Sequence, residues 1–167
     1  PLFLADTTVN FNPTAEEIVE IAELSAKQVE KFNIKPRIAL ITYSNFGSAE
    51  GDDAKKMKKA VQLLKQRNPK MIVDGEMQAH LPFNLDLMKE NHPFSDLAEQ
   101  GANVLIFPNL SSSNIAYNLV KEIADIEKIG PILLGLKKPV HVVQLGSTTR
   151  EIVNMIAIAV VDAQMNK

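Results

Sequence analysis

One stretch near the C-terminus combines the residue types of an anion-binding turn. Residues 144–151 read Gln-Leu-Gly-Ser-Thr-Thr-Arg-Glu, between the β-branched run 139–143 and the apolar run 152–163. This order predicts a strand, a tight glycine turn and the N-terminus of a helix. Such a junction presents unpaired backbone N–H groups and the positive end of the helix dipole to an anion. We therefore expect Gly146 and Thr148 to contact a ligand.

The same turn has no charged residue at its tip, where Leu145 precedes Gly146. Thr148 and Glu151 have the spacing of a capping box, in which each side chain binds the backbone N–H of the other residue. A capping box accounts for Glu151 without any chemistry. The lack of a charged residue at the tip therefore bears on whether the turn belongs to an enzyme or to a ligand sensor.

Two other junctions have the same layout, with polar side chains after an apolar strand. Tyr-Ser-Asn-Phe-Gly-Ser stands at 43–48, and Pro-Asn-Leu-Ser-Ser-Ser-Asn stands at 108–114. Hydroxyls, amides and a glycine at the carboxyl end of a strand suit an anion or phosphoester site. The alternative for both junctions is ordinary helix capping, by Ser48 in the first and by the serines in the second. The candidate ligand-binding residues are Tyr43, Ser44, Asn45, Ser48, Asn109, Ser111, Ser112 and Asn114.

Few other residues have the types and spacing of a catalytic, metal-binding or nucleotide-binding site. Asp74-Gly75-Glu76 places two carboxylates at a strand end, where acid–base work is one interpretation. A tight turn with solvated charges is the favoured one. His80, His92 and His141 lack metal-ligand spacing, so we expect no metal site. Neither G-x-G-x-x-G nor a Walker A loop occurs, which excludes nucleotide binding of those kinds.

The composition indicates one compact globular domain, with 167 residues, 46% of them hydrophobic and 23% charged. The net charge of −2 gives no electrostatic support for nucleic-acid binding. Cysteine is absent, so we expect a reducing, cytoplasmic location. No apolar run reaches the roughly 18 residues of a membrane span, and no membrane partner is expected. Because the chain begins with Pro1 rather than Met, we expect a domain excised from a longer protein.

Strands and helices are expected to alternate along the chain. Residues 2–4 together with 7–9 predict a short strand or an extended entry. Apolar runs predict strands at 37–43, 71–73, 101–108 and 139–143, with 130–136 as a further apolar segment. Helical spacing predicts helices at about 14–32, 52–67, 111–126 and from 152 onwards, with a short one around 85–89. Thr14 and Glu17 predict a capping box at the first helix. The alternation predicts an α/β fold, a three-layer α/β/α sandwich with a mostly parallel sheet.

Several blocks of sequence, from the first residues to the last helix, carry a family resemblance. They are ADTTVN at 5–10, NPTAE at 12–16, YSNFGS at 43–48, DGEMQ at 74–78, ANVLIFP at 102–108 and GPILLGLKKP at 130–139. In combination they resemble the phosphate acetyl/butyryltransferase family, which has an isocitrate/isopropylmalate dehydrogenase-like fold. The resemblance implies that residues 1–167 are the second half of that family's domain pair. YSNFGS most resembles the copy fused to the C-terminus of bacterial NADP-dependent malic enzymes.

The sequence departs from this family at the catalytic turn. Active members have Ser-Arg-Gly there and an Asp five residues after the Gly. The resemblance implies that the arginine binds the phosphate and thioester and that the aspartate deprotonates the CoA thiol. The matching positions here are Gln144, Leu145, Gly146 and Glu151. Leu145 cannot hold a phosphate bidentately, and losing one such partner typically costs about 10² to 10³ in rate. We therefore expect no catalytic residue in this chain.

The resemblance implies a regulatory and oligomerisation domain that senses acetyl-CoA or CoA and has no cofactor of its own. The parent enzyme would convert malate to pyruvate and CO₂, using NADP and a divalent metal (Mg or Mn) in N-terminal malic enzyme domains of the same chain. A last helix that is apolar on every face indicates a homo-oligomer. The alternatives are a fragment of an active phosphate acetyltransferase or butyryltransferase, and a purely structural oligomerisation module.

Overall fold

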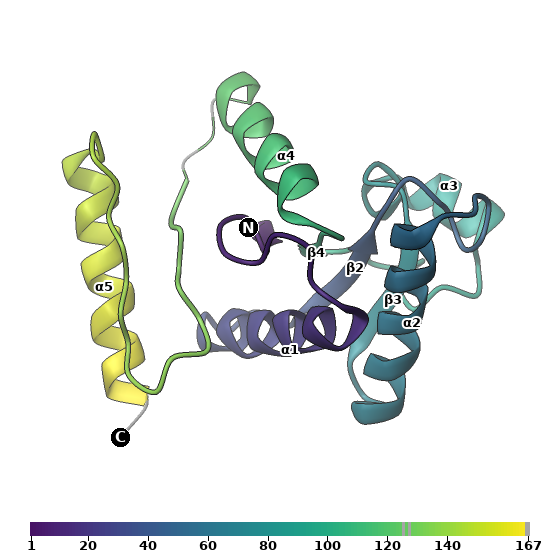
Figure 1. The fold of residues 1–167 in the computed structure, drawn as a ribbon, viewed down its shortest axis with the longest axis horizontal. Helices are drawn as coiled ribbons and strands as arrows, with labels where there is room; N and C mark the ends of the chain where they lie inside the picture. Colours follow the sequence, from purple (N-terminus) through teal and green to yellow (C-terminus); the bar gives the residue numbers. More distant parts are fainter. Residues whose placement is uncertain (125, 127, 166–167) are drawn as a thin grey trace. The chain divides into compact units, whose positions relative to one another are not determined.

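The computed structural model describes residues 1–124, 126 and 128–165. The chain forms two compact units, Pro1–Ala116 and a C-terminal unit that starts at Tyr117, and each is described by itself. Figure 1 shows the order of the elements along the chain. Within the described residues, no helix has the length and apolar character needed to cross a bilayer.

The N-terminal unit is built on a four-stranded parallel sheet. Its strands are β1 (Phe3–Ala5), β2 (Arg37–Ile41), β3 (Ile72–Met77) and β4 (Val104–Ile106). Their order across the sheet is β1-β4-β2-β3, and every neighbouring pair is parallel. Parallel neighbours need crossover connections, which helices supply here. The predicted α/β fold with a parallel sheet is therefore confirmed.

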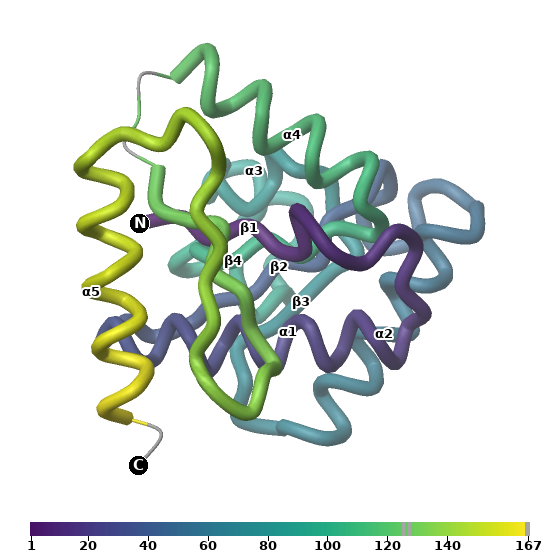
Figure 2. The backbone as a smooth tube through the Cα atoms, turned by 60° about the vertical axis from the view of Figure 1, so that its left-hand side comes forward, coloured from purple at the N-terminus to yellow at the C-terminus, as the bar shows by residue number. Residues whose placement is uncertain are grey.

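Helices cover both faces of this sheet, as the predicted three-layer sandwich requires. On one face, α1 (Ala15–Lys31) and α2 (Asp52–Arg67) pack against Ile38, Leu40 and Ile106. On the other, the 3-10 turn η1 (Leu81–Phe83) and α3 (Leu85–Asn91) pack against Ala39, Ile41, Leu105 and Phe107. Figure 2 shows α1 and α2 on the opposite side of the strands from α3. Successive residues of one strand thus enter two different cores, so the strands lack polar alternation.

Local sequence signals account for the helix boundaries in the N-terminal unit. The predicted capping box opens α1, because the Thr14 hydroxyl accepts the Glu17 N–H and the Glu17 carboxylate accepts the Thr14 N–H. The α2 helix carries Asp52 and Asp53 in its first turn and Lys65 and Arg67 in its last, which complements the helix dipole. These helices agree with the predicted ranges to within two residues.

The C-terminal unit contains the end of α4 (Leu110–Ile123), an extended segment and α5 (Thr149–Met165). The strand predicted at 139–143 is wrong: none of these residues lies in a strand. A β-branched run becomes a strand only where a neighbour supplies ladder hydrogen bonds, and the described residues supply none to this run. Val140, Val142 and Val143 are accordingly exposed.

All four strands differ in extent from the prediction. β2 ends at Ile41 rather than at residue 43, and β4 is Val104–Ile106 rather than 101–108. The first strand is Phe3–Ala5 alone, and residues 7–9 form bends rather than extended chain. The third strand does not end before Asp74; it continues through Gly75 and Glu76 to Met77. The expected tight turn at 74–76 is therefore wrong, and its two carboxylates lie inside the sheet.

Candidate ligand-binding edge and turn

The carboxyl ends of the four parallel strands meet at one edge of the sheet. Ala5 pairs with Ile106, Leu40 pairs with Ile106, and Ile41 pairs with Met77. The segments that follow these strand ends therefore lie along the same edge. They include Asp6 after β1, residues 42–48 after β2, Gln78 after β3 and residues 107–113 after β4. Ligands of open α/β sheets bind outside this end of the strands.

A buried glutamate holds the first predicted junction. Glu76 is 1% exposed, and its Oε1 accepts hydrogen bonds from the Ser44 hydroxyl at 3.0 Å and the Gly47 N–H at 2.5 Å. The Glu76 carbonyl oxygen accepts the Phe46 N–H at 2.8 Å. Ser44 is fully buried by this arrangement. Glu76 thus fixes the shape of the turn at 44–48, and in this structure the Ser44 hydroxyl is turned away from solvent.

Asp74 lies in the same strand and is also buried rather than solvated. Its Oδ1 is 3.2 Å from the Lys65 Nζ on α2, and its Oδ2 accepts the Asp96 N–H at 3.0 Å. Burial lowers the pKa of Lys65, but hydrogen bonds and charge from Asp96 and Asp74 outweigh burial and raise it above 10.5. Asp74 is therefore part of a structural ion pair.

The remaining polar residues of this junction bind one another. The Asn45 Oδ1 accepts the Gln78 N–H at 2.8 Å, and the Gln78 Nε2 donates to the Tyr43 carbonyl oxygen at 2.8 Å. The Ser48 Oγ accepts the Asn45 N–H at 2.8 Å. Helix α2 instead begins after Gly51, without a side-chain cap, so the reading of Ser48 as its cap is wrong. Tyr43 and Ser48 are the exposed side chains of this turn.

The second junction is held by Asn109. Its Oδ1 accepts the Ser112 N–H at 2.9 Å, as an N-cap does, and its Nδ2 donates to Asp53 at 3.0 Å. Ser113 is buried, with its hydroxyl 2.5 Å from the Asp6 carbonyl oxygen. Capping is thus supplied by Asn109 rather than by the serines. Ser111 and Asn114 lie toward solvent, and the Asn114 Nδ2 donates to the Thr7 carbonyl oxygen at 3.3 Å.

Asp6 organises the loop after β1, a role that the sequence did not indicate. Its carboxylate accepts the N–H groups of Thr8 at 2.8 Å, Val9 at 3.0 Å and Asn10 at 2.7 Å. Burial raises the pKa of Asp6, but these backbone donors outweigh it and hold the pKa below 3.8. An aspartate directly after a strand, with an asparagine four residues later, is the signal that points to such a loop.

The turn at 144–151 lies in the C-terminal unit, with Leu145 fully exposed at its tip. The predicted capping box is confirmed: the Thr148 N–H donates to the Glu151 Oε2 at 2.7 Å, and the Glu151 N–H donates to the Thr148 hydroxyl at 3.2 Å. The other carboxylate oxygen, Oε1, is 2.9 Å from the Lys128 Nζ. The hydrogen bond from Lys128, with those from Thr148, holds the pKa of Glu151 below 4.5.

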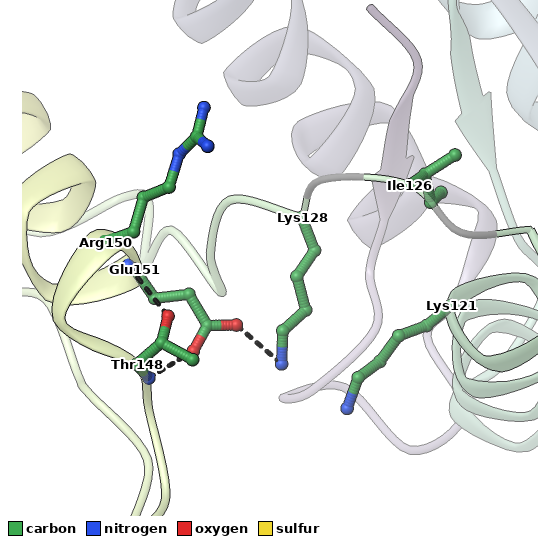
Figure 3. Close-up of a pocket in the computed structure, with 6 residues that line it drawn as sticks. All are labelled: Lys121, Ile126, Lys128, Thr148, Arg150 and Glu151. Atoms are coloured by element: carbon green, nitrogen blue, oxygen red, sulfur yellow. Dashed lines mark hydrogen bonds and ion pairs between the residues drawn. The ribbon is translucent and has the colours of Figure 1, made fainter.

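A hollow of about 230 Å³ adjoins this capping box (Figure 3). Its lining residues are Lys121, Ile126, Lys128, Thr148, Arg150 and Glu151. Figure 3 shows the Lys128 side chain extending to Glu151, and the Arg150 side chain extending away from that carboxylate. The sequence indicated Thr148 as a ligand contact but not the two lysines, because Lys128 precedes the start of the turn by 16 residues and Lys121 by 23.

His141 is the one histidine with a recorded acidic partner among the described residues. Its Nε2 is 3.1 Å from the Asp162 Oδ2, and both side chains are buried. The His141 Nδ1 is buried without a hydrogen-bond partner. Among the described residues, no group of three His, Cys, Asp or Glu side chains is placed to hold a metal ion.

Comparisons of the sequence with known proteins identify the family to which the chain is similar. The profile of the Phosphate acetyl/butaryl transferase family matches residues 1–160. The chain is 45% identical over 163 residues to the NADP-dependent malic enzyme of Haemophilus influenzae, covering 98% of this chain and 21% of that protein. It is 39% identical over 164 residues to the phosphate acetyltransferase of Clostridium acetobutylicum, covering 98% of this chain and 49% of that protein.

A solved structure shares the same fold. A phosphotransacetylase from Streptococcus pyogenes matches with a TM-score of 0.91 and 34% identity, covering 97% of this chain and 49% of that one. The chain thus spans about a fifth of the matched malic enzyme and about half of the matched acyltransferases.

Proposed function

The chain belongs to the phosphate acetyl/butaryl transferase family, and we propose that it is a transferase-like regulatory region of an NADP-dependent malic enzyme. In this proposal the region binds acetyl-CoA or CoA and does not transfer acyl groups. The observation that carries the proposal is the turn at 144–151, where an exposed Leu145 occupies the tip and Glu151 is fully engaged by its neighbours.

The malic enzyme assignment is supported by the matched relatives. The region of similarity in the Haemophilus influenzae enzyme is about as long as this chain but is only 21% of that protein. The part of that protein outside the matched region is long enough to contain further domains. We propose that the parent of this chain likewise oxidises malate to pyruvate and CO₂ in domains N-terminal to it. Those domains would bind NADP and a divalent metal, Mg or Mn, and the protein would be cytoplasmic.

The absence of transfer chemistry follows from the chemistry of the turn. Transfer to or from phosphate needs a cation that holds the phosphoryl group and a base that removes the thiol proton. Leu145 provides neither charge nor donor, and its exposed apolar side chain disfavours a phosphate beside it. Glu151 is a poor base, because the hydrogen bond from Lys128 holds its pKa below 4.5 and both carboxylate oxygens are engaged.

Ligand binding without catalysis remains compatible with the carboxyl edge of the sheet. There, Tyr43, Ser111 and Asn114 lie toward solvent, on turns fixed by Glu76, Asn109 and Asp6. We propose these exposed groups, with Asn45 and Ser48, as contacts of acetyl-CoA or CoA in the N-terminal unit. Gly146 and Thr148 are proposed separately as ligand contacts in the C-terminal unit. Binding regulates the parent enzyme only if it favours one arrangement of the subunits or domains over another. The exposed apolar residues of α5 support a homo-oligomer as the assembly through which this acts.

The test is a transferase assay of the full-length protein with acetyl phosphate and CoA. We expect no turnover above background in the wild type. Leu145→Arg combined with Gln144→Ser restores the family residues at the turn and is the gain-of-function variant; Leu145→Met with Gln144→Ser is its neutral control. Turnover in the first variant and not in the control would support the role given to Leu145. Wild-type turnover typical of a transferase would overturn the proposal.

A working phosphate acyltransferase is the second candidate function. The 39% identity to the Clostridium acetobutylicum enzyme, which extends across 49% of that protein, favours it. The same assay decides between the two candidates, because only an active transferase forms acetyl-CoA from acetyl phosphate and CoA without substitution at the turn.

A further inference from the structure

Polar side chains from three different segments form one chain of contacts at the carboxyl edge of the sheet. The Asn109 Nδ2 donates to the Asp53 Oδ2 at 3.0 Å, and the Asp53 Oδ1 lies 2.9 Å from the Lys56 Nζ. The Lys56 amine also donates to the Asn12 Oδ1 at 2.9 Å. Asn12 follows β1, and Asn109 follows β4, while Asp53 and Lys56 lie at the start of α2, which follows β2. The contacts therefore join the segments after three of the four strands, all within the N-terminal unit.

Asp53 restricts the orientation of the amide that caps α4. The Asn109 Oδ1 accepts the Ser112 N–H at 2.9 Å, while the Asn109 Nδ2 donates to Asp53. A backbone N–H only donates and a carboxylate only accepts, so these two neighbours permit one orientation of the amide. Aspartate caps helices about as well as asparagine, but at position 109 it would place a second negative charge against Asp53. The neighbour at position 53 thus accounts for an asparagine at this cap.

Lys56 holds Asp53 in this position. Its amine contacts both Asp53 and Asn12, so the carboxylate has a cationic partner as well as the Asn109 amide. The side chains of Lys56 and Asp53 are 15% and 31% exposed, which places their contact partly out of solvent. Salt screens such a pair less than it screens an exposed one. The loop after β1 is thereby held against the start of α2.

We propose that Asp53 is a positioning residue for ligand binding at the carboxyl edge, acting through Asn109. This deepens the proposed function and rests on it, because the solvent-facing groups after β4, Ser111 and Asn114, are proposed contacts of acetyl-CoA or CoA. Both lie in the first turns of α4, directly after the cap, so their placement depends on the orientation of Asn109. Asp53 acts without touching the ligand.

Asp52 provides the matched control for Asp53. Both aspartates lie in the first turn of α2, where each complements the positive end of the helix dipole. Asp52 is exposed, whereas Asp53 contacts Asn109 and Lys56. Asp53→Ala and Asp52→Ala therefore remove the same charge from the same end of the helix. A difference between the two variants measures the contacts of Asp53 rather than its effect on the helix dipole.

An exchange of the two side chains gives a second, independent variant. Asn109→Asp keeps a good N-cap residue but brings a carboxylate against Asp53. Adding Asp53→Asn to Asn109→Asp restores a donor and an acceptor with their roles exchanged, and this should rescue the position of the cap. A role that depends only on the charge at position 53 predicts no rescue, because the double variant lacks that charge.

The experiment combines calorimetric titration of the full-length protein with acetyl-CoA and hydrogen exchange of the Ser112 amide. We expect Asp53→Ala and Asn109→Asp each to weaken acetyl-CoA binding about five- to tenfold and to accelerate exchange at Ser112. Asp52→Ala should leave both quantities unchanged. The double variant Asp53→Asn with Asn109→Asp should return to within about twofold of the wild type in both.

Two results would overturn the proposal: equal acetyl-CoA affinities for Asp53→Ala and Asp52→Ala, and a double variant that binds no better than Asn109→Asp. Failure of the proposed function is recognised separately, as a wild type that does not bind acetyl-CoA. In that case exchange at Ser112 decides the positioning role of Asp53 without a ligand. Faster exchange in Asp53→Ala than in Asp52→Ala, reversed in the double variant, supports this role, and equal exchange in the two alanine variants overturns it.

Discussion

The Ser44–Glu76 hydrogen bond allows the structural basis of the ligand-binding edge to be tested first. Glu76 lies in β3, and its Oε1 accepts both the Ser44 hydroxyl and the Gly47 N–H of the turn after β2. Replacing Glu76 by alanine leaves both donors without an acceptor, whereas Glu76→Gln keeps an acceptor oxygen in the same place. Ser44→Ala removes one of the two donors. Glu50→Ala, at an exposed glutamate in the following segment, serves as the control.

The size of the effect follows from the burial of these groups. A buried donor left without an acceptor costs about 1–3 kcal/mol, so two donors cost about 2–6 kcal/mol. The second oxygen of Glu76, Oε2, is buried without a partner, and its desolvation cost disappears together with the side chain. We therefore expect a net loss of about 2–3 kcal/mol for Glu76→Ala. A smaller loss is expected for Glu76→Gln, and a change within about 0.5 kcal/mol for Glu50→Ala.

Equilibrium unfolding in urea measures these differences, and a double-mutant cycle isolates the pair. Because Ser44 and Glu76 share one hydrogen bond, the double alanine variant should lose less than the sum of the single losses, by about 1 kcal/mol. Hydrogen exchange of the Gly47 amide should accelerate in Glu76→Ala. Strict additivity, or a Glu76→Ala variant as stable as Glu50→Ala, would refute the assignment of Glu76 as the residue that fixes this turn.

Three further predictions concern other features of the structure. The folded pKa of Asp6 lies below its ordinary value of 3.8, so its contribution to stability is present above that value and is lost as pH falls through the lower folded pKa. Acid titration of unfolding should show this loss in the wild type and not in Asp6→Asn. Gly75→Ala should destabilise by about 2–4 kcal/mol, because the new Cβ would lie 2.7 Å from the Leu40 carbonyl oxygen at a φ of +140°. Gly47→Ala, at a φ of +91° but with no atom within 4 Å of the new Cβ, should carry backbone strain without the steric overlap and cost less in the same urea experiment. Ile156 and Val160 are exposed on α5, and Ile156→Asp should dissociate an oligomer that the wild type forms in sedimentation equilibrium; a wild-type monomer at micromolar concentration would contradict this.

The features that the sequence predicted well depend on residues close together in the chain. Both capping boxes, Thr14 with Glu17 and Thr148 with Glu151, join residues three apart, so their partners are visible in the sequence. The alternation of strands and helices, and hence the parallel sheet, likewise follows from local hydrophobic patterns.

The features that it missed depend on distant partners. Glu76 was expected in a solvated turn, and its burial is explained by Ser44 and Gly47, about thirty positions earlier. The run at 139–143 has the composition of a strand, yet strand formation requires a neighbouring ladder that the sequence pattern does not reveal. Lys121 and Lys128 become part of the hollow at Glu151 only through the fold of the C-terminal unit.

The most direct test of the account is the malic enzyme activity of the full-length protein, measured as malate-dependent reduction of NADP with and without acetyl-CoA. We predict that acetyl-CoA changes this rate and that the change disappears when residues 1–167 are deleted while basal malate oxidation continues. A rate unaffected by saturating acetyl-CoA, or an acetyl-CoA response that survives the deletion, would contradict the assignment of this chain as a regulatory acetyl-CoA-binding domain.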